Sequence, residues 1–158
     1  MEYNREVDLF IVVGAVYLVA APVALLFFYI WAVRGWRRRE VVLLSLFSLP
    51  LTYAVGKLLG LFISNPLPFV VNGTTPLIEH AANNGFPSDH MLLAAAVSQI
   101  ALHVNRRLGY VCWAFAICIG YARIAAGVHH IEDVVASASI AIVCVWLTDR
   151  ILARFVRR

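Results

Sequence analysis

Residues 108–133 have the sequence LGYVCWAFAICIGYARIAAGVHHIED. It contains an apolar run over about residues 108–122, then a short polar loop, and then the beginning of a second apolar run, about residues 131–156. A helix of about 20 apolar residues is long enough to cross a lipid bilayer. The stretch therefore predicts two transmembrane helices, joined by a loop that carries an arginine and two histidines.

Three more apolar runs precede this stretch, at about residues 8–33, 41–63 and 91–104. The third is too short to cross a bilayer by itself, so we expect it to begin in a recess walled by other helices. The chain is 62% apolar and 14% charged, whereas soluble domains are about 45–50% apolar and about 25% charged. The sequence predicts one domain, residues 1–158: an all-α, polytopic membrane helical bundle with about five transmembrane helices.

The arginines predict the orientation of this bundle. The N-terminal tail is net acidic, and with five spans every basic cluster falls on one side, which the positive-inside rule makes cytoplasmic. We therefore expect the N-terminus outside and the C-terminus in the cytoplasm, with loops 64–90 and 123–130 facing outward. Short clusters between apolar runs also argue against nucleic acid as a partner. The basic clusters are Arg34 with Arg37, Arg38 and Arg39; Arg106 with Arg107; and Arg154 with Arg157 and Arg158.

Charged and polar residues gather at the predicted outer ends of four spans, although they lie far apart in the sequence. Such groups are costly near hydrocarbon and cluster where they pair or bind something. Each has an alternative interpretation by itself: a lysine can extend to the interface, an arginine can anchor a helix end, and a serine can cap a helix. Together they indicate a site. They are Lys57, Ser88, Asp89, His90, Arg123, His129 and Asp133.

The chemistry of this set favours phosphate. The backbone N–H groups and the Ser88 hydroxyl at a helix N-terminus form an anion site, to which Lys57 and Arg123 would add positive charge. His129 and Asp133 are four residues apart on one helix face, so the carboxylate can accept from one imidazole nitrogen and leave the other basic.

Two neighbours complicate this interpretation. Asp89 puts a carboxylate beside the anion site, which is unfavourable unless it points away, is protonated or meets a cation. His130 is a rival nucleophile, because it lies three residues before Asp133 and can also meet that carboxylate.

Three motifs resemble signatures of the type 2 phosphatidic acid phosphatase (PAP2) superfamily. Arg123, His129 and Asp133 have the spacing of its third signature, and Pro87-Ser88-x-His90 resembles the second. Lys57 looks like a degraded first signature, because Ser64 and Asn65 stand where the family has Arg-Pro. The hexapeptide GFPSDH, residues 85–90, with Asp in place of the frequent Gly, looks most like bacterial undecaprenyl-diphosphate phosphatases of the BcrC type.

The resemblance implies an integral membrane phosphatase that needs no cofactor or metal and forms a phosphohistidine. The predicted orientation puts its site on the outer face of the cell membrane, which is the periplasmic face in a bacterium. It implies that undecaprenyl diphosphate is hydrolysed to undecaprenyl phosphate, with phosphatidylglycerol phosphate, phosphatidic acid or another lipid phosphate as alternatives. His129 would be the nucleophile, Asp133 would orient it, and His90 would be the acid and then the base. The phosphate would be held by Lys57, Ser88 and Arg123, with Asp89 in the same site.

Two other functions stay open at this stage. A metallohydrolase could draw its ligands from Glu79, His80, His90, His129, His130 and Glu132, although an arginine in the site would repel a cation. A small protein that binds an anionic lipid without turnover would need the basic residues but no oriented nucleophile. For the histidine mechanism we expect a bell-shaped pH dependence around the ordinary imidazole pKa of about 6.5.

Overall fold

Helices make up most of the described chain, residues 5–155 of this computed structural model, as the apolar runs predict. Within these residues the only β-pairing is an isolated antiparallel bridge between Pro66 and Asn84. The helices are α1 (Arg5–Val16), α2 (Ala20–Ala32), α3 (Gly35–Phe62), α4 (Pro68–Asn72), α5 (Asp89–Val104), α6 (Arg106–Ala125) and α7 (Ile131–Phe155).

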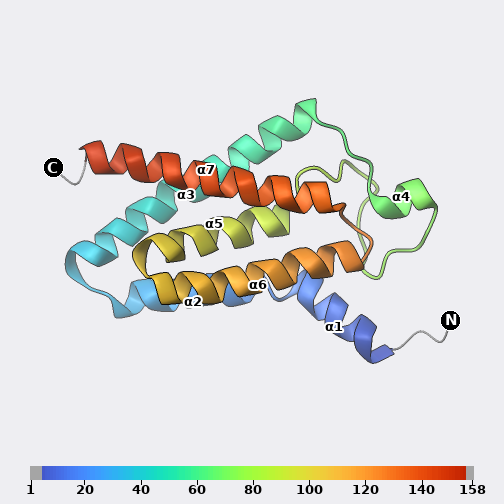
Figure 1. Cartoon of the computed structure of the whole chain (residues 1–158), viewed down its shortest axis with the longest axis horizontal. Coiled ribbons are helices and arrows are strands. Elements are labelled where there is room, and N and C mark those ends of the chain that lie inside the picture. The colour runs from blue at the N-terminus through green and yellow to red at the C-terminus, as the bar shows by residue number, and fades with distance from the viewer. Residues whose placement is uncertain (1–4, 156–158) are drawn as a thin grey trace.

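The short helix α5 runs through the middle of the bundle, between α6 and α7 in Figure 1. Its buried face is rich in alanine, including Ala94, Ala95 and Ala101, each with no exposed surface. Small side chains of this kind let neighbouring helices approach closely in a membrane. Gly109 continues the same packing on α6, because a β-carbon there would collide with the backbone of Leu102 on α5. The run at residues 91–104 was expected to be surrounded by other helices because it is too short to cross a bilayer by itself. The central position of α5 agrees with that expectation.

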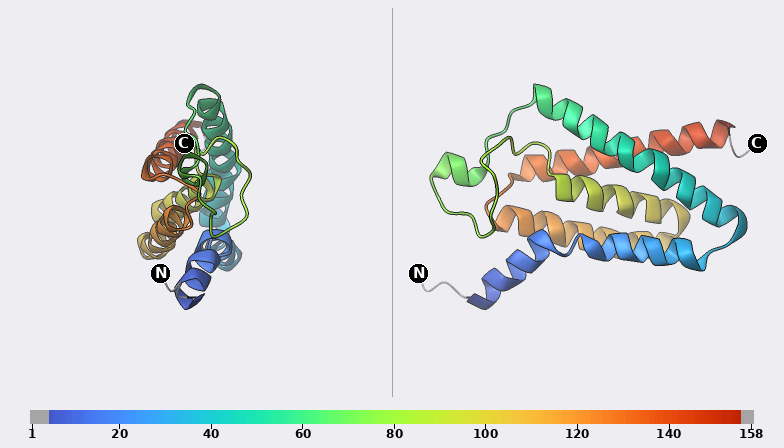
Figure 2. Two further views of the ribbon diagram at one scale, coloured as in Figure 1. Left: turned by 90° about the vertical axis from the view of Figure 1, so that its right-hand side faces the viewer. Right: turned by 180° about the vertical axis from the view of Figure 1, so that it is seen from behind.

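The first predicted span is broken into α1 and α2, which meet at an angle of 45° (Figure 2). Pro22 explains the break, because it has no N–H to donate to the carbonyl four residues earlier. Around the bend, the Leu18 N–H reaches back to Val13 at 3.1 Å, and the Ala20 N–H bonds Tyr17 at 3.0 Å. The helical bonding pattern is therefore interrupted where the sequence shows one continuous apolar run.

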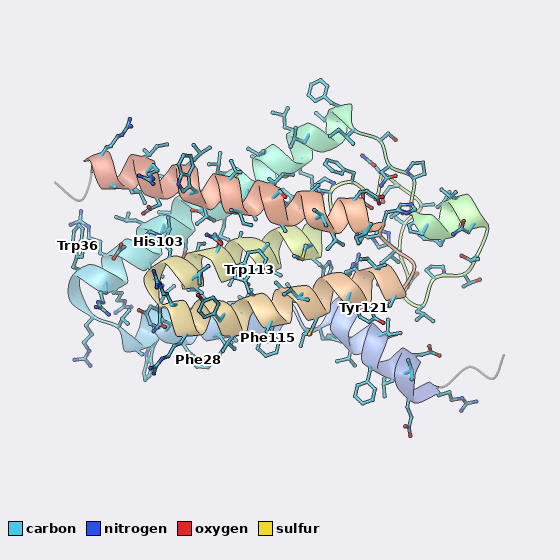
Figure 3. The ribbon with its side chains drawn as sticks, viewed as in Figure 1. Phe28, Trp36, His103, Trp113, Phe115 and Tyr121 are labelled. Carbon is cyan, nitrogen blue, oxygen red and sulfur yellow. The ribbon has the colours of Figure 1, made fainter. Side chains whose placement is uncertain are left out.

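The chain is an integral membrane protein whose helices match the predicted spans in position. By length and composition α3, α6 and α7 can each cross a membrane, and the bent pair α1–α2 gives a fourth candidate, whereas α5 has only 16 residues. Large apolar side chains cover the outside of the bundle: Phe28 on α2 is 63% exposed and Tyr121 on α6 is 70% exposed (Figure 3). Such a surface is suited to lipid.

The two ends of the bundle differ in character (Figure 1). Helix α4 and the loop before α5 lie at one end. The arginines of the α2–α3 and α5–α6 connections lie at the other, where Figure 3 also shows Trp36 and His103. This separation is the one that the basic clusters predict, although Glu2, Arg157 and Arg158 are outside the described residues. Helix α4 ends at Asn72 and is followed by Gly73 in a left-handed conformation (φ 61°). It falls in a segment that was expected to be a loop.

Candidate active site

A cavity of about 340 Å³ opens where the loop between α4 and α5 meets the ends of α3, α5 and α6. Its wall contains five of the seven predicted site residues. The two others, Ser88 and Asp133, have no exposed surface. Topology therefore brings together residues as far apart in the sequence as Lys57 and His129, which are 72 positions apart (129 − 57). The five are Lys57, Asp89, His90, Arg123 and His129.

His129 is buried in this wall, with 4% of its surface exposed. Its Nδ1 lies 2.9 Å from the carbonyl oxygen of Gly85, and since a carbonyl only accepts, Nδ1 carries the hydrogen. Arg123 donates to Nε2 at 3.1 Å, so Nε2 bears the lone pair. Burial lowers the pKa of His129 to about 4, with the Arg123 charge acting in the same direction and Asp133 opposing it. His129 is therefore a neutral base at neutral pH.

The expected hydrogen bond between His129 and Asp133 is not formed in this structure. Their closest atoms, Nδ1 and Oδ2, are 3.7 Å apart, beyond hydrogen-bonding distance. Both carboxylate oxygens have other donors: Asn65 Nδ2 at 2.8 Å from Oδ1, and the backbone N–H of His130 at 2.9 Å from Oδ2. Asp133 is thus a buried charge beside the imidazole, whose hydrogen is accepted by Gly85.

Asn84 and Gly85 fix the loop that supplies this acceptor. The Asn84 side chain donates to the carbonyls of Gly60 at 2.9 Å and Ile63 at 2.8 Å, which ties the loop to the end of α3. The N–H of Gly85 donates to the Asn65 carbonyl at 2.8 Å. A β-carbon at Gly85 would lie 2.9 Å from that oxygen, so only glycine fits. Sequence reasoning missed these residues; the Asn-Gly pair before the second motif was the one available signal.

Ser88 lies behind the cavity wall, directly before α5. Its N–H donates to the hydroxyl of Ser137 at 2.9 Å, and that hydroxyl donates to the Asp133 carbonyl at 2.6 Å. One of the N–H groups expected to meet an anion is therefore already used. The Ser88 hydroxyl is different: it is buried and has no hydrogen-bond partner within residues 5–155. A buried hydroxyl without a partner is unfavourable, so a ligand at this helix end would relieve it.

Arg123 is buried at the end of α6, with 3% of its surface exposed. It donates to the carbonyl of Ala15 at 3.3 Å, so helix α1 helps to hold it. Its Nε is buried and lacks a partner within the described chain. A buried guanidinium with an unused donor on a cavity wall is suited to an anion.

The carboxylate of Asp89 pairs with a cation. This is one of the arrangements in which a carboxylate can be accommodated beside an anion site. Lys57 Nζ lies 2.8 Å from Asp89 Oδ2, across the gap between α3 and α5. About half of each side chain is exposed, 47% and 52%, so the pair can part at little cost. Lys57 is therefore placed to exchange this carboxylate for a phosphate.

His130 points away from the wall that His129 lines. Its Nε2 donates to the Pro66 carbonyl at 3.1 Å, which anchors the α6–α7 connection to the loop after α3. Glu79 and His80, two of the possible metal ligands, do line the cavity. Within residues 5–155, however, no three His, Cys, Asp or Glu side chains converge closely enough to hold a metal ion.

Comparison with known proteins gives consistent matches. The family model described as the PAP2 superfamily matches residues 41–157. An undecaprenyl-diphosphatase BcrC of Bacillus subtilis (strain 168) is 32% identical over 148 residues, which is 94% of this chain and 76% of the relative. A bacitracin transport permease protein BcrC of Bacillus licheniformis is 30% identical over 113 residues, 71% of this chain and 56% of the relative.

Two solved structures share the fold. The structure of Aquifex aeolicus LpxE has a TM-score of 0.73 at 24% identity, covering 94% of this chain and 88% of that one. The structure of a transmembrane PAP2-type phosphatidylglycerolphosphate phosphatase from Bacillus subtilis has a TM-score of 0.65 at 18% identity, covering 99% and 80%. At these identities the likeness concerns the fold alone.

Proposed function

Since the chain belongs to the PAP2 superfamily and is a membrane lipid phosphatase, we propose that it converts undecaprenyl diphosphate to undecaprenyl phosphate through a phosphohistidine at His129. One observation carries the mechanism. His129 is neutral, with its Nδ1 hydrogen held by Gly85 and its Nε2 turned to Arg123 on a cavity wall. The name of the 32% identical Bacillus subtilis relative supports the choice of substrate.

In the first step Nε2 of His129 attacks the terminal phosphorus, and the bond from that phosphorus to the bridging oxygen breaks. His90, on the same cavity wall, gives a proton to the departing oxygen of the lipid phosphate. Arg123 turns from Nε2 to the phosphoryl oxygens and neutralises their charge together with Lys57. The Nε of Arg123, which lacks a partner within residues 5–155, would then have one.

In the second step His90, now neutral, takes a proton from a water molecule that attacks the phosphorus. The phosphorus–nitrogen bond breaks, its electron pair returns to Nε2, and inorganic phosphate leaves. Asp133, buried 3.7 Å from Nδ1, stabilises the positive charge of the phosphorylated imidazole. Both steps use residues of this chain alone, so activity should persist in a chelator.

A second cavity supports a substrate with a long apolar tail. It has a volume of about 220 Å³, lies between α3 and α5, and is lined by apolar groups that include Leu49, Leu92 and Ala96. Asp89 lines both this groove and the polar cavity, so the two lie next to each other at this residue. A headgroup in the polar cavity could thus leave its chain in the groove, open to lipid.

We further propose that the site faces the outside of the cell membrane. The basic connections lie at the opposite end of the bundle, and the positive-inside rule makes that end cytoplasmic.

The test is phosphate release by the detergent-purified protein in EDTA. Undecaprenyl diphosphate, phosphatidylglycerol phosphate and phosphatidic acid are offered separately, with His129→Ala as the control. We expect release from the diphosphate that EDTA does not affect and that His129→Ala abolishes. Phosphate release from only one of the other lipids would mean that this lipid, and not undecaprenyl diphosphate, is the substrate. Loss of release in EDTA would replace the mechanism with a metal-dependent one, and no release from any lipid would contradict the activity.

A further inference from the structure

The cavity holds one imidazole that the proposed mechanism does not use, that of His80. It belongs to the loop between α4 and α5. Its ring centroid lies 5.7 Å from the ring centroid of His129, and the two ring planes are at 85°, which is an edge-to-face contact. A side chain this close to the nucleophile is within reach of the group that binds there.

The His80 ring is held in place by its surroundings. Its Nδ1 donates to the Ala81 carbonyl at 3.0 Å, and the ring of Phe69 packs edge-on with the centroids 6.5 Å apart. Because Nδ1 is used by the backbone, Nε2 is the ring atom left for a ligand. A neutral Nε2 accepts a hydrogen bond, and a protonated Nε2 donates one to an anion.

The loop that carries His80 is fastened on both sides of it. Before it, the Leu77 N–H donates to the Ala126 carbonyl at 3.1 Å, and Ile78 is buried against Val128, with 8% of its surface exposed. After it, the Asn84 side chain binds the end of α3. The imidazole therefore keeps its place on the wall because of the fold.

The charges on the cavity wall leave a diphosphate incompletely balanced. Its cations are Lys57, Arg123 and, in the first step, the protonated His90, and Glu79 and Asp89 are two acids on the same wall. His129 is uncharged at neutral pH. A diphosphate carries a second phosphate that needs donors of its own, beyond those proposed for the terminal one.

We propose that His80 binds the second phosphate of a diphosphate headgroup through Nε2 and thereby favours lipid diphosphates over lipid monophosphates. This inference rests on the proposed function, because it assumes that the terminal phosphate occupies Nε2 of His129. The neighbouring phosphate would then lie in the same cavity, which the His80 ring also lines.

Binding of two small non-hydrolysable ligands tests this without turnover. Methylenediphosphonate and methylphosphonate are titrated calorimetrically into the full chain in detergent under identical conditions. We expect His80→Gln to lower the affinity for methylenediphosphonate about tenfold, the value of one charge-assisted hydrogen bond. The affinity for methylphosphonate should fall by less than about twofold. His80→Lys should restore most of the difference. The matched control is His130→Gln, which removes an imidazole that does not line the cavity and should leave both affinities unchanged.

Equal weakening of both ligands by His80→Gln, or no weakening of either, would overturn the inference, as would a wild-type chain that does not prefer the diphosphonate. Each result is independent of the phosphatase assay. Normal phosphate release with unchanged diphosphonate binding in His80→Gln would contradict only the role of His80. Diphosphonate binding that depends on His80, without phosphate release from any lipid, would contradict only the proposed activity.

Discussion

At the scale of single residues, His129 is positioned by groups that differ from the expected ones. The spacing to Asp133 predicts a direct hydrogen bond, but Gly85 accepts the Nδ1 hydrogen while Asn65 and the His130 N–H hold the carboxylate. This arrangement leaves Nε2 basic, which is the property that a nucleophile needs. The route to that property could not be read from the sequence, because it depends on a backbone carbonyl.

Asn65 should be required for the stability of the site. Asn65→Asp keeps the shape but places a carboxylate oxygen against Oδ1 of the buried Asp133, so a hydrogen bond becomes a repulsion in a partly buried place. We expect a loss of at least about 1–3 kcal/mol in the free energy of unfolding, the cost of leaving a buried polar group unsatisfied. Thermal unfolding in detergent measures it, with the exposed Asn72→Asp as control. Equal stability of both variants would contradict the account.

The pH dependence of activity should reflect the lowered pKa of His129. A base whose pKa is about 4 stays neutral down to that pH, so its protonation should reduce kcat/KM only as pH falls through about 4. The alkaline limb would follow loss of the proton from His90. The profile is measured with a lipid diphosphate in detergent, with circular dichroism to show that the chain stays folded. An acid limb near the ordinary imidazole value of about 6.5 would contradict it.

At the scale of helices, the most informative feature is the groove between α3 and α5. Ala96 lies on its wall with 1% of its surface exposed. Ala96→Phe should fill the groove and raise KM for undecaprenyl diphosphate about tenfold or more, whereas a short water-soluble diphosphate such as isopentenyl diphosphate should be hydrolysed nearly as before. Ile117→Phe, on the exposed side of α6, is the matched control. Equal losses for both substrates would mean that the variant perturbs the site rather than the tail.

The sequence predicted the helical elements well where the signal was a long apolar run. The runs beginning near Val41, Met91, Leu108 and Ile131 all became helices, since apolar length is a strong signal in a membrane protein. The bend before Pro22 and the helix α4 were missed. Both depend on where backbone hydrogen bonds go over a few residues, which an apolar run does not show.

The residues of the site could be predicted from the sequence, but the loop contacts that hold them could not. The seven residues singled out in the sequence do come together, because topology places the span ends at one end of the bundle. The loop 64–90 has no periodic pattern, so its contacts through Asn65, Asn84 and Gly85 could not be foreseen. His80 appeared in the sequence only as a possible metal ligand, and its place beside His129 required the structure.

At the scale of the whole molecule, the orientation in the membrane is the property to test. Thr75→Cys on the loop at the α4 end and Arg38→Cys at the basic end report on opposite ends of the bundle. A membrane-impermeant maleimide should label the first in intact cells and the second only after permeabilisation. The chain without an added cysteine gives the background from Cys118, which is exposed on the outside of the bundle. Labelling of the basic end in intact cells would reverse the proposed topology.

The phosphohistidine at His129 can be detected on the protein itself. Rapid quenching under alkaline conditions, which preserve phosphohistidine, followed by mass spectrometry of the peptides, should locate the group on His129 during turnover of undecaprenyl diphosphate. His130→Ala should leave this signal in place, because the His130 side chain is turned to Pro66. Phosphate on His130, or full turnover by His129→Ala, would contradict the account.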